Sequence, residues 1–241
     1  MVNLKKAYHQ VLNEIPENVQ LVAVSKTKPI EMIQTLYDEG QRVFGENRVQ
    51  ELIEKQDVLP KDIEWHMIGH LQSKKVKYIA SFVSLIHSVD SVKLLKVINQ
   101  EAKKNNRIID CLIQFHIADE ESKYGFNPTQ IEEQIKEIKT LDLNNVNIKG
   151  VMGMATFTDN MNQISEEFKK LNQVFHELKK TYLPNISILS MGMSGDYQAA
   201  EGNVHGGVDI TNGPEKDGAD KHLKENTEEV KHPKIFQFYH P

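Results

Sequence analysis

The sequence has little that would place a protein in an oxidising or membrane environment. Its 241 residues contain one cysteine, Cys111, so no disulfide can form within the chain and a reducing compartment is favoured. It has no stretch of about 18 apolar residues, the length that a membrane-spanning helix needs. Residues 1–15 have the spacing of an amphipathic helix and lack the continuous apolar core of a signal peptide. We therefore expect a cytoplasmic globular protein.

Common ligand motifs are also missing. The chain has no P-loop and no glycine-rich dinucleotide fingerprint, and a net charge of −5 gives no general attraction to nucleic acid or acidic membranes. His66 and His70 have a spacing that suits a metal on one helix, but their segment has the pattern of a strand that runs into a loop. We expect hydrogen-bonded histidines, an inert core Cys111, and a monomer without metal, nucleic-acid or membrane partners.

What the chain does contain is an alternation of short apolar runs and longer helical patterns. The runs are rich in Val and Ile with little polar alternation, which is typical of strands buried on both faces. They span residues 19–25, 42–45, 64–69, 84–89, 110–117, 146–154 and 186–193. Strand-then-helix units without hairpin signals indicate an α/β fold with a parallel sheet. We predict a (β/α)8 barrel with an extra N-terminal helix; a doubly wound open sheet is the alternative.

The pattern weakens toward the C-terminus. Residues 203–213 (NVHGGVDITNG) are a glycine-broken, atypical candidate for the eighth strand, and residues 214–234 are charged and nearly free of apolar side chains. The final IFQFYH either docks on the fold or extends from it. We expect a barrel domain over residues 1–210 and a divergent, flexible polar tail over 211–241.

Two segments at the expected carboxyl ends of strands carry candidate chemistry, because functional groups gather at that end of such barrels. Lys26 follows the first strand, where partial desolvation would lower its pKa and let the neutral amine attack an aldehyde to form a Schiff base. An ordinary lysine in solvent is the alternative. The seventh strand ends in SMGMSGD, where backbone N–H groups and the Ser194 hydroxyl can hold a phosphate. A plain glycine turn capped by Ser194 is the alternative.

Several motifs occur in a fixed order over about residues 3–200: AVSKTKP, FGENRVQE, EWHMIGHLQSKK, HSVDS, ESKYGF, KGVMGM and LSMGMSGDY. In them the chain resembles the pyridoxal phosphate homeostasis proteins, single-domain relatives of the N-terminal barrel of alanine racemase. The resemblance implies a non-catalytic barrel that binds and buffers pyridoxal 5'-phosphate, a form of vitamin B6. It also implies cofactor-binding residues, which are Lys26 as the Schiff-base lysine, Asn47, Ser190, Gly192, Met193, Ser194 and Gly195.

The chain departs from this family at two places. Lys74 stands where the family usually has asparagine, and the last arginine of the chain is Arg107. The family's eighth strand usually supplies an arginine to the pyridine nitrogen, in a pattern like VRIGTAIFG. Losing such a contact and part of the phosphate site costs about 1.5–3 kcal/mol, or roughly ten- to more than a hundredfold in affinity. Two alternatives therefore stay open: a racemase-like enzyme of low activity, and a degenerate paralogue that does not bind the cofactor.

Overall fold

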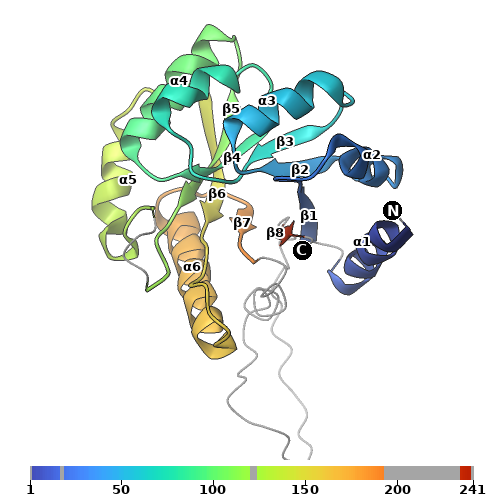
Figure 1. Ribbon diagram of the computed structural model, residues 1–241. Coiled ribbons are helices and arrows are strands. Elements are labelled where there is room, and N and C mark those ends of the chain that lie inside the picture. Colours follow the sequence, from blue (N-terminus) through green and yellow to red (C-terminus); the bar gives the residue numbers. More distant parts are fainter. Residues whose placement is uncertain (1, 17–18, 120–123, 193–233, 240–241) are drawn as a thin grey trace, which may run out of the picture.

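The computed structural model describes residues 2–16, 19–119, 124–192 and 234–239. These residues form a closed barrel whose parallel strands follow one another in sequence order from β1 to β8 (Figure 1). The strands are β1 (Val19–Val24), β2 (Val43–Glu46), β3 (Glu64–Met67), β4 (Leu85–Val89), β5 (Ile109–Gln114), β6 (Val146–Met152), β7 (Ile188–Ser190) and β8 (Lys234–Tyr239). The barrel fold, and not the open sheet, is therefore confirmed.

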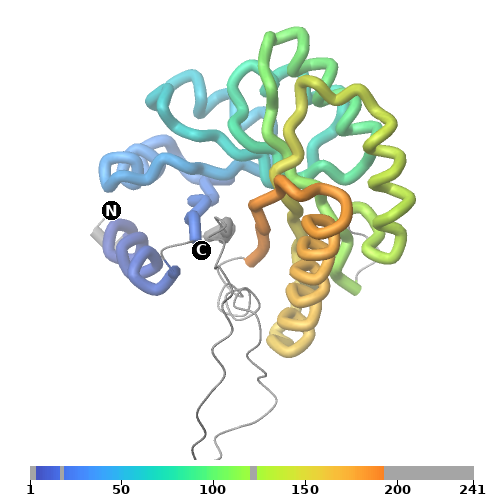
Figure 2. Tube along the Cα trace, turned by 180° about the vertical axis from the view of Figure 1, so that it is seen from behind, coloured from blue at the N-terminus to red at the C-terminus, as the bar shows by residue number. Residues whose placement is uncertain are grey.

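Helices surround the strands on the outside (Figures 1 and 2). They are α1 (Val2–Glu14), α2 (Ile30–Asp38), α3 (Val49–Val58), α4 (Val92–Lys104), α5 (Ile131–Lys139) and α6 (Met161–Thr181), with two 3-10 helices, η1 (Ser73–Tyr78) and η2 (Pro128–Gln130). The extra N-terminal helix α1 packs Tyr8 and Val11 against Leu21 of β1. Among the described residues, no further helix lies between α6 and α1 on the outside of the barrel.

The period-two alternation of the strands divides the core into two layers. Outward-facing residues such as Phe44, Trp65 and Leu189 pack against the helices. The barrel interior contains a small apolar layer made of Val22, Val43, Leu85, Leu112 and Met152. Toward the carboxyl ends of the strands, the interior positions become polar, with His66, His87 and Ser190 all buried. This change from apolar to polar marks the end of the barrel where a ligand can be held.

The eighth strand differs from the sequence-based expectation. It is formed by residues 234–239, which run parallel to β1 along its whole length and pair with Leu189 and Ser190 of β7. The candidate strand at 203–213 lies outside the described residues. Residues 234–239 thus belong to the barrel sheet, although the sequence suggested that they are part of a tail. The sequence did not predict this strand because its place depends on pairing with the distant strand β1. The division of the chain near residue 210 stays a prediction.

No helix within the described ranges combines the length and the apolar composition that crossing a membrane would require.

Candidate functional site

Lys26 directly follows β1 at the carboxyl end of the barrel. Its side chain is half-buried, and this burial lowers the pKa of its ammonium, while the charges of Glu46 and Glu51 act in the opposite direction. A lowered pKa is the direction that the sequence led us to expect for a lysine at a barrel mouth. At this position the Lys26 amine is neutral, and therefore nucleophilic, more readily than the amine of an exposed lysine.

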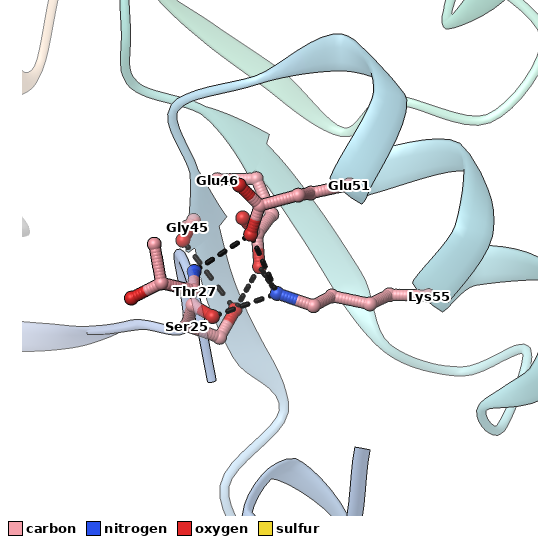
Figure 3. A network of polar contacts seen from close by, with 6 residues as sticks. All are labelled: Ser25, Thr27, Gly45, Glu46, Glu51 and Lys55. Carbon is pink, nitrogen blue, oxygen red and sulfur yellow. Dashed lines mark hydrogen bonds and ion pairs between the residues drawn. The ribbon is translucent and has the colours of Figure 1, made fainter. Parts of the chain in front are cut away.

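A polar network, buried at Ser25, Glu46 and Lys55, anchors the chain on both sides of Lys26 (Figure 3). We call it the Lys55 network; its members are Ser25, Thr27, Glu46, Glu51 and Lys55. The Lys55 ammonium donates to the Ser25 carbonyl oxygen at 2.7 Å, to Glu46 Oε1 at 2.7 Å and to Glu51 Oε2 at 3.2 Å. The Ser25 hydroxyl donates to Glu46 Oε1 at 2.6 Å, and the Thr27 N–H donates to Glu51 Oε2 at 2.6 Å.

The network lies where α3 packs on the outer face of the sheet. Ser25 directly follows β1 and Glu46 is the last residue of β2. The Ser25 N–H donates to the Gly45 carbonyl oxygen, which continues the ladder between these strands. Glu51 and Lys55 stand one helical turn apart on α3, so both side chains reach the same spot. Burial raises the pKa of Glu46, and the bonds from Lys55 and Ser25 oppose that change.

Asn47 follows β2 at the same end of the barrel and supplies an unsatisfied acceptor. Its Oδ1 atom is buried and has no hydrogen-bond partner among the described residues. Its backbone lies against Gly69, where an added Cβ would come within 2.5 Å of the Asn47 carbonyl oxygen. A buried oxygen without a donor costs about 1–3 kcal/mol, so a ligand or a water molecule that donates a hydrogen bond there is favoured.

A chain of hydrogen bonds crosses the barrel interior to Ser190, the last residue of β7. His87 Nδ1 lies 2.9 Å from Ser190 Oγ, and His87 Nε2 lies 3.0 Å from His66 Nδ1. Burial lowers the pKa of His66 to about 3 and also lowers the pKa of His87, further helped by His66. Both rings are therefore neutral at physiological pH. The expectation of a hydrogen-bonded core histidine is confirmed for His66.

The turn after β7 is only partly described. Met191 is buried, and Gly192 has a φ of +86°, a backbone conformation that favours glycine because it has no Cβ. Met193, Ser194 and Gly195, which the family resemblance assigns to the cofactor, lie outside the described residues. Of the expected site residues, Lys26, Asn47, Ser190 and Gly192 thus all stand at or just beyond the carboxyl ends of β1, β2 and β7.

His70 lies apart from the histidine chain, at the rim. Its Nδ1 atom is 3.1 Å from Asp90 Oδ2, and its ring stacks on Tyr124 with centroids 4.0 Å apart. These residues border an open cavity of about 470 Å³ between the loops that follow β3, β4 and β5. The described residues contain no group of three or more His, Cys, Asp or Glu side chains arranged for a metal. Cys111 is a buried core residue, and burial raises the pKa of its thiol.

Sequence reasoning missed Glu46, Lys55 and His87 as members of the site. Glu46 precedes Asn47 in the motif FGENRVQE, and His87 begins the motif HSVDS. The spacing of Glu51 and Lys55 is that of an ordinary exposed helix pair. Only the packing of α3 against Ser25, thirty residues earlier, distinguishes Lys55 from a surface lysine.

A closed parallel barrel with a partly desolvated lysine after its first strand defines the class of alanine-racemase-like barrels. Residues 2–211 match the family described as "Alanine racemase, N-terminal domain". The chain is 41% identical over 182 residues to the "Pyridoxal phosphate homeostasis protein" of Aquifex aeolicus, covering 75% of this chain and 79% of that protein. Its counterpart in Pasteurella multocida is 37% identical over 204 residues, covering 82% and 85%. The chain therefore belongs to the pyridoxal phosphate homeostasis protein family.

Solved structures agree with this assignment. PipY of Synechococcus elongatus, determined without PLP, superposes with a TM-score of 0.80 at 28% identity, covering 98% of this chain and 97% of PipY. The structure of PipY with PLP bound gives a TM-score of 0.77. An alanine racemase of Clostridium difficile shares the fold, with a TM-score of 0.68 at 18% identity, and the match covers 81% of this chain and 50% of the racemase.

Proposed function

We propose that this protein binds and buffers pyridoxal 5'-phosphate, with Lys26 as the point of covalent attachment. The observation that carries the proposal is the position of Lys26 at the barrel mouth, where burial lowers the pKa of its amine. The family membership and the structure of PipY with PLP bound support the same ligand. When bound, the cofactor supplies an aldehyde whose carbon bonds to the Lys26 nitrogen while the aldehyde oxygen leaves as water.

The other residues at this end of the barrel have separate roles in the proposal. The Oδ1 atom of Asn47, which has no hydrogen-bond partner among the residues that the structure describes, accepts a hydrogen bond from the ligand and orients it. The Ser190 hydroxyl, held by His87, and the backbone turn that begins at Gly192 provide donors for the phosphate. The nucleophile, after β1, and these donors, at the end of β7, stand at the same end of the barrel, as binding of an aldehyde with a phosphate arm would require.

We further propose that the protein is a carrier without a catalytic reaction. Racemisation needs a second acid or base on the opposite face of the cofactor. Among the described residues, the carboxylates that act on the Lys26 amine are Glu46 and Glu51, and both are engaged by Lys55. A carboxylate that is bound to a buried ammonium is poorly placed to take a proton from a substrate.

Cofactor titration tests the proposal. We expect the purified protein to turn yellow with added pyridoxal phosphate and the Lys26→Ala variant to remain colourless. Lys28→Ala is the matched control, because it removes a lysine two residues away and should keep the colour. A folded wild-type protein that stays colourless would contradict the proposal and favour a degenerate, non-binding paralogue. Solvent-deuterium exchange at the α-carbon of an added amino acid, lost in Lys26→Ala, would instead identify a racemase-like enzyme.

The proposal includes a cytoplasmic location and a monomeric state. The buried thiol of Cys111 agrees with a reducing compartment. Fractionation of cells and light scattering of the purified protein test these two points.

A further inference from the structure

The three acceptors of Lys55 lie on three different segments of the chain, which are the end of β1, the end of β2 and helix α3. An ammonium has three N–H donors, and those of Lys55 are directed at the Ser25 carbonyl oxygen, Glu46 and Glu51. The Lys55 side chain is 8% exposed and that of Glu46 is fully buried. Burying an ion pair costs desolvation free energy, so such a pair is weak evidence for a role in stability alone.

The Lys55 network contacts the residues on both sides of Lys26 in the sequence. Lys55 and Glu46 bind the carbonyl oxygen and the hydroxyl of Ser25, the residue before Lys26. Glu51 accepts a hydrogen bond from the backbone N–H of Thr27, the residue after Lys26. Thr27 has a φ of +60°, a backbone conformation that a β-branched residue rarely adopts. The network therefore holds Lys26 in position from both sides.

The charges of the network also act on the Lys26 amine. Glu46 and Glu51 each favour the protonated form of Lys26, in opposition to its burial. Lys55 binds both carboxylates, and Arg48, at the start of α3, lies near Glu51. Two unpaired carboxylates beside a lysine would keep it as an ammonium, which cannot attack an aldehyde.

We propose that Lys55 is a positioning residue for Lys26: it fixes the backbone beside Lys26 through the Ser25 carbonyl and neutralises the two carboxylates that would otherwise keep the Lys26 amine protonated. The inference rests on the proposed function only in taking the neutral Lys26 amine as the reactive form.

The protonation of Lys26 can be measured without any cofactor. Lysines are reductively methylated with 13C-formaldehyde, the Lys26 signal is assigned with Lys26→Arg, and its chemical shift is followed against pH. We expect Lys55→Met to move the Lys26 midpoint to higher pH and Glu51→Gln to move it to lower pH. Lys61→Met is the matched control, because within the described part of the chain Lys61 donates to backbone carbonyls at the end of α3. It should leave the midpoint unchanged.

A double variant separates charge from structure. Lys55→Met leaves Glu46 buried without its cation and weakens the fold, whereas Lys55→Met with Glu46→Gln removes both charges of the pair. We expect the double variant to return the midpoint toward that of the wild type and Lys55→Met alone to slow cofactor attachment at pH 7 on the order of tenfold. If Lys55→Met does not fold, the comparison of Glu46→Gln with the double variant decides the question, because it measures the effect of Lys55 on the remaining carboxylate, Glu51.

Two results would overturn the inference: an unchanged Lys26 midpoint in folded Lys55→Met, or equal midpoints in Glu46→Gln and in the double variant. Midpoints that move as expected in a protein that takes up no pyridoxal phosphate would support the role of Lys55 and refute the proposed function. The two claims therefore fail separately.

Discussion

The Nδ1 atom of His87 lies 2.9 Å from the Oγ atom of Ser190, across the interior of the barrel from β4 to β7. The other ring nitrogen of His87 meets His66 Nδ1 at 3.0 Å. Because burial keeps both rings neutral, the contact between them contains a single proton. If His66 holds this proton, His87 carries its own on Nδ1 and donates to Ser190. The Ser190 hydroxyl is then able to donate to a phosphate.

This ordering predicts the tautomer of His87 in the loaded protein. With pyridoxal phosphate bound, we expect His87 to carry its proton on Nδ1, since a phosphate oxygen accepts and cannot donate. The measurement is the pair of 15N chemical shifts of the His87 ring, recorded with and without the cofactor. An Nε2-protonated His87 in the loaded protein would mean that Ser190 donates to the ring and does not hold the phosphate.

Substitutions of His87 test the same contact through affinity. His87→Asn keeps an N–H group near the position of Nδ1, whereas His87→Phe removes it at similar volume. We expect His87→Phe to weaken cofactor binding by about tenfold and His87→Asn to weaken it less, because one hydrogen bond contributes about 0.5–1.5 kcal/mol. Equal losses in both variants, measured by absorbance titration, would argue that His87 only fills space.

The same histidines predict how stability depends on pH. The folded-state pKa of His66 is lowered to about 3, below the ordinary value of 6.5, so the unfolded chain binds the proton more readily. Stability is then complete above about pH 6.5 and falls as the pH decreases toward 3, by about 1.4 kcal/mol per unit for each such group. The raised pKa of Glu46 acts in the opposite direction above pH 4.5, which reduces the net slope.

Urea unfolding at pH 7.5 and pH 5.5 measures this dependence. We expect the loss of stability at pH 5.5 to be smaller in His66→Asn, which places a neutral amide near the position of Nδ1. His176→Gln, at an exposed position of α6, is the control and should keep the wild-type dependence. The same loss in His66→Asn as in the wild type would show that protonation of His66 does not drive it.

Much of the barrel can be read from local sequence because its strands are short runs that alternate with amphipathic helices. The seven apolar runs that were predicted as strands overlap β1 to β7, with ends that differ by a few residues. Lys26 could be placed at the barrel mouth from one rule, that the carboxyl ends of parallel strands share a face. Both predictions rest on patterns among residues that are close together in the sequence.

The parts that could not be predicted depend on contacts between distant residues. His87 and Ser190 are 103 positions apart and meet only because the barrel closes around them. The bond from Lys55 to Ser25 depends on how α3 lies on the sheet. The pairing of residues 234–239 with β1 follows a long charged segment whose composition suggested a tail, and no local pattern reveals that register.

Gly69 gives a prediction for the Asn47 side of the site. In Gly69→Ala, the new methyl group would come within 2.5 Å of the Asn47 carbonyl oxygen and 2.7 Å of its Cα atom, so the backbone of Asn47 must move. We expect weaker cofactor binding together with a loss of about 1–3 kcal/mol in stability. Gly153→Ala is the control, since its methyl group meets the ends of the Ile117 and Leu171 side chains. If only stability changes, Asn47 does not orient the ligand.

The eighth strand gives a prediction that separates the barrel from the expected tail. Ile235 pairs with Gln20 of β1 on one side and with Ser190 of β7 on the other. A proline at this position removes a backbone N–H from the sheet and leaves strand edges unpaired. We expect Ile235→Pro to lower the free energy of unfolding by about 1–3 kcal/mol. Asn226→Pro, in the segment predicted to be a flexible tail, should have no effect. An unchanged stability in Ile235→Pro would mean that residues 234–239 do not close the barrel in solution, whereas a large loss in Asn226→Pro would place that segment in the folded domain.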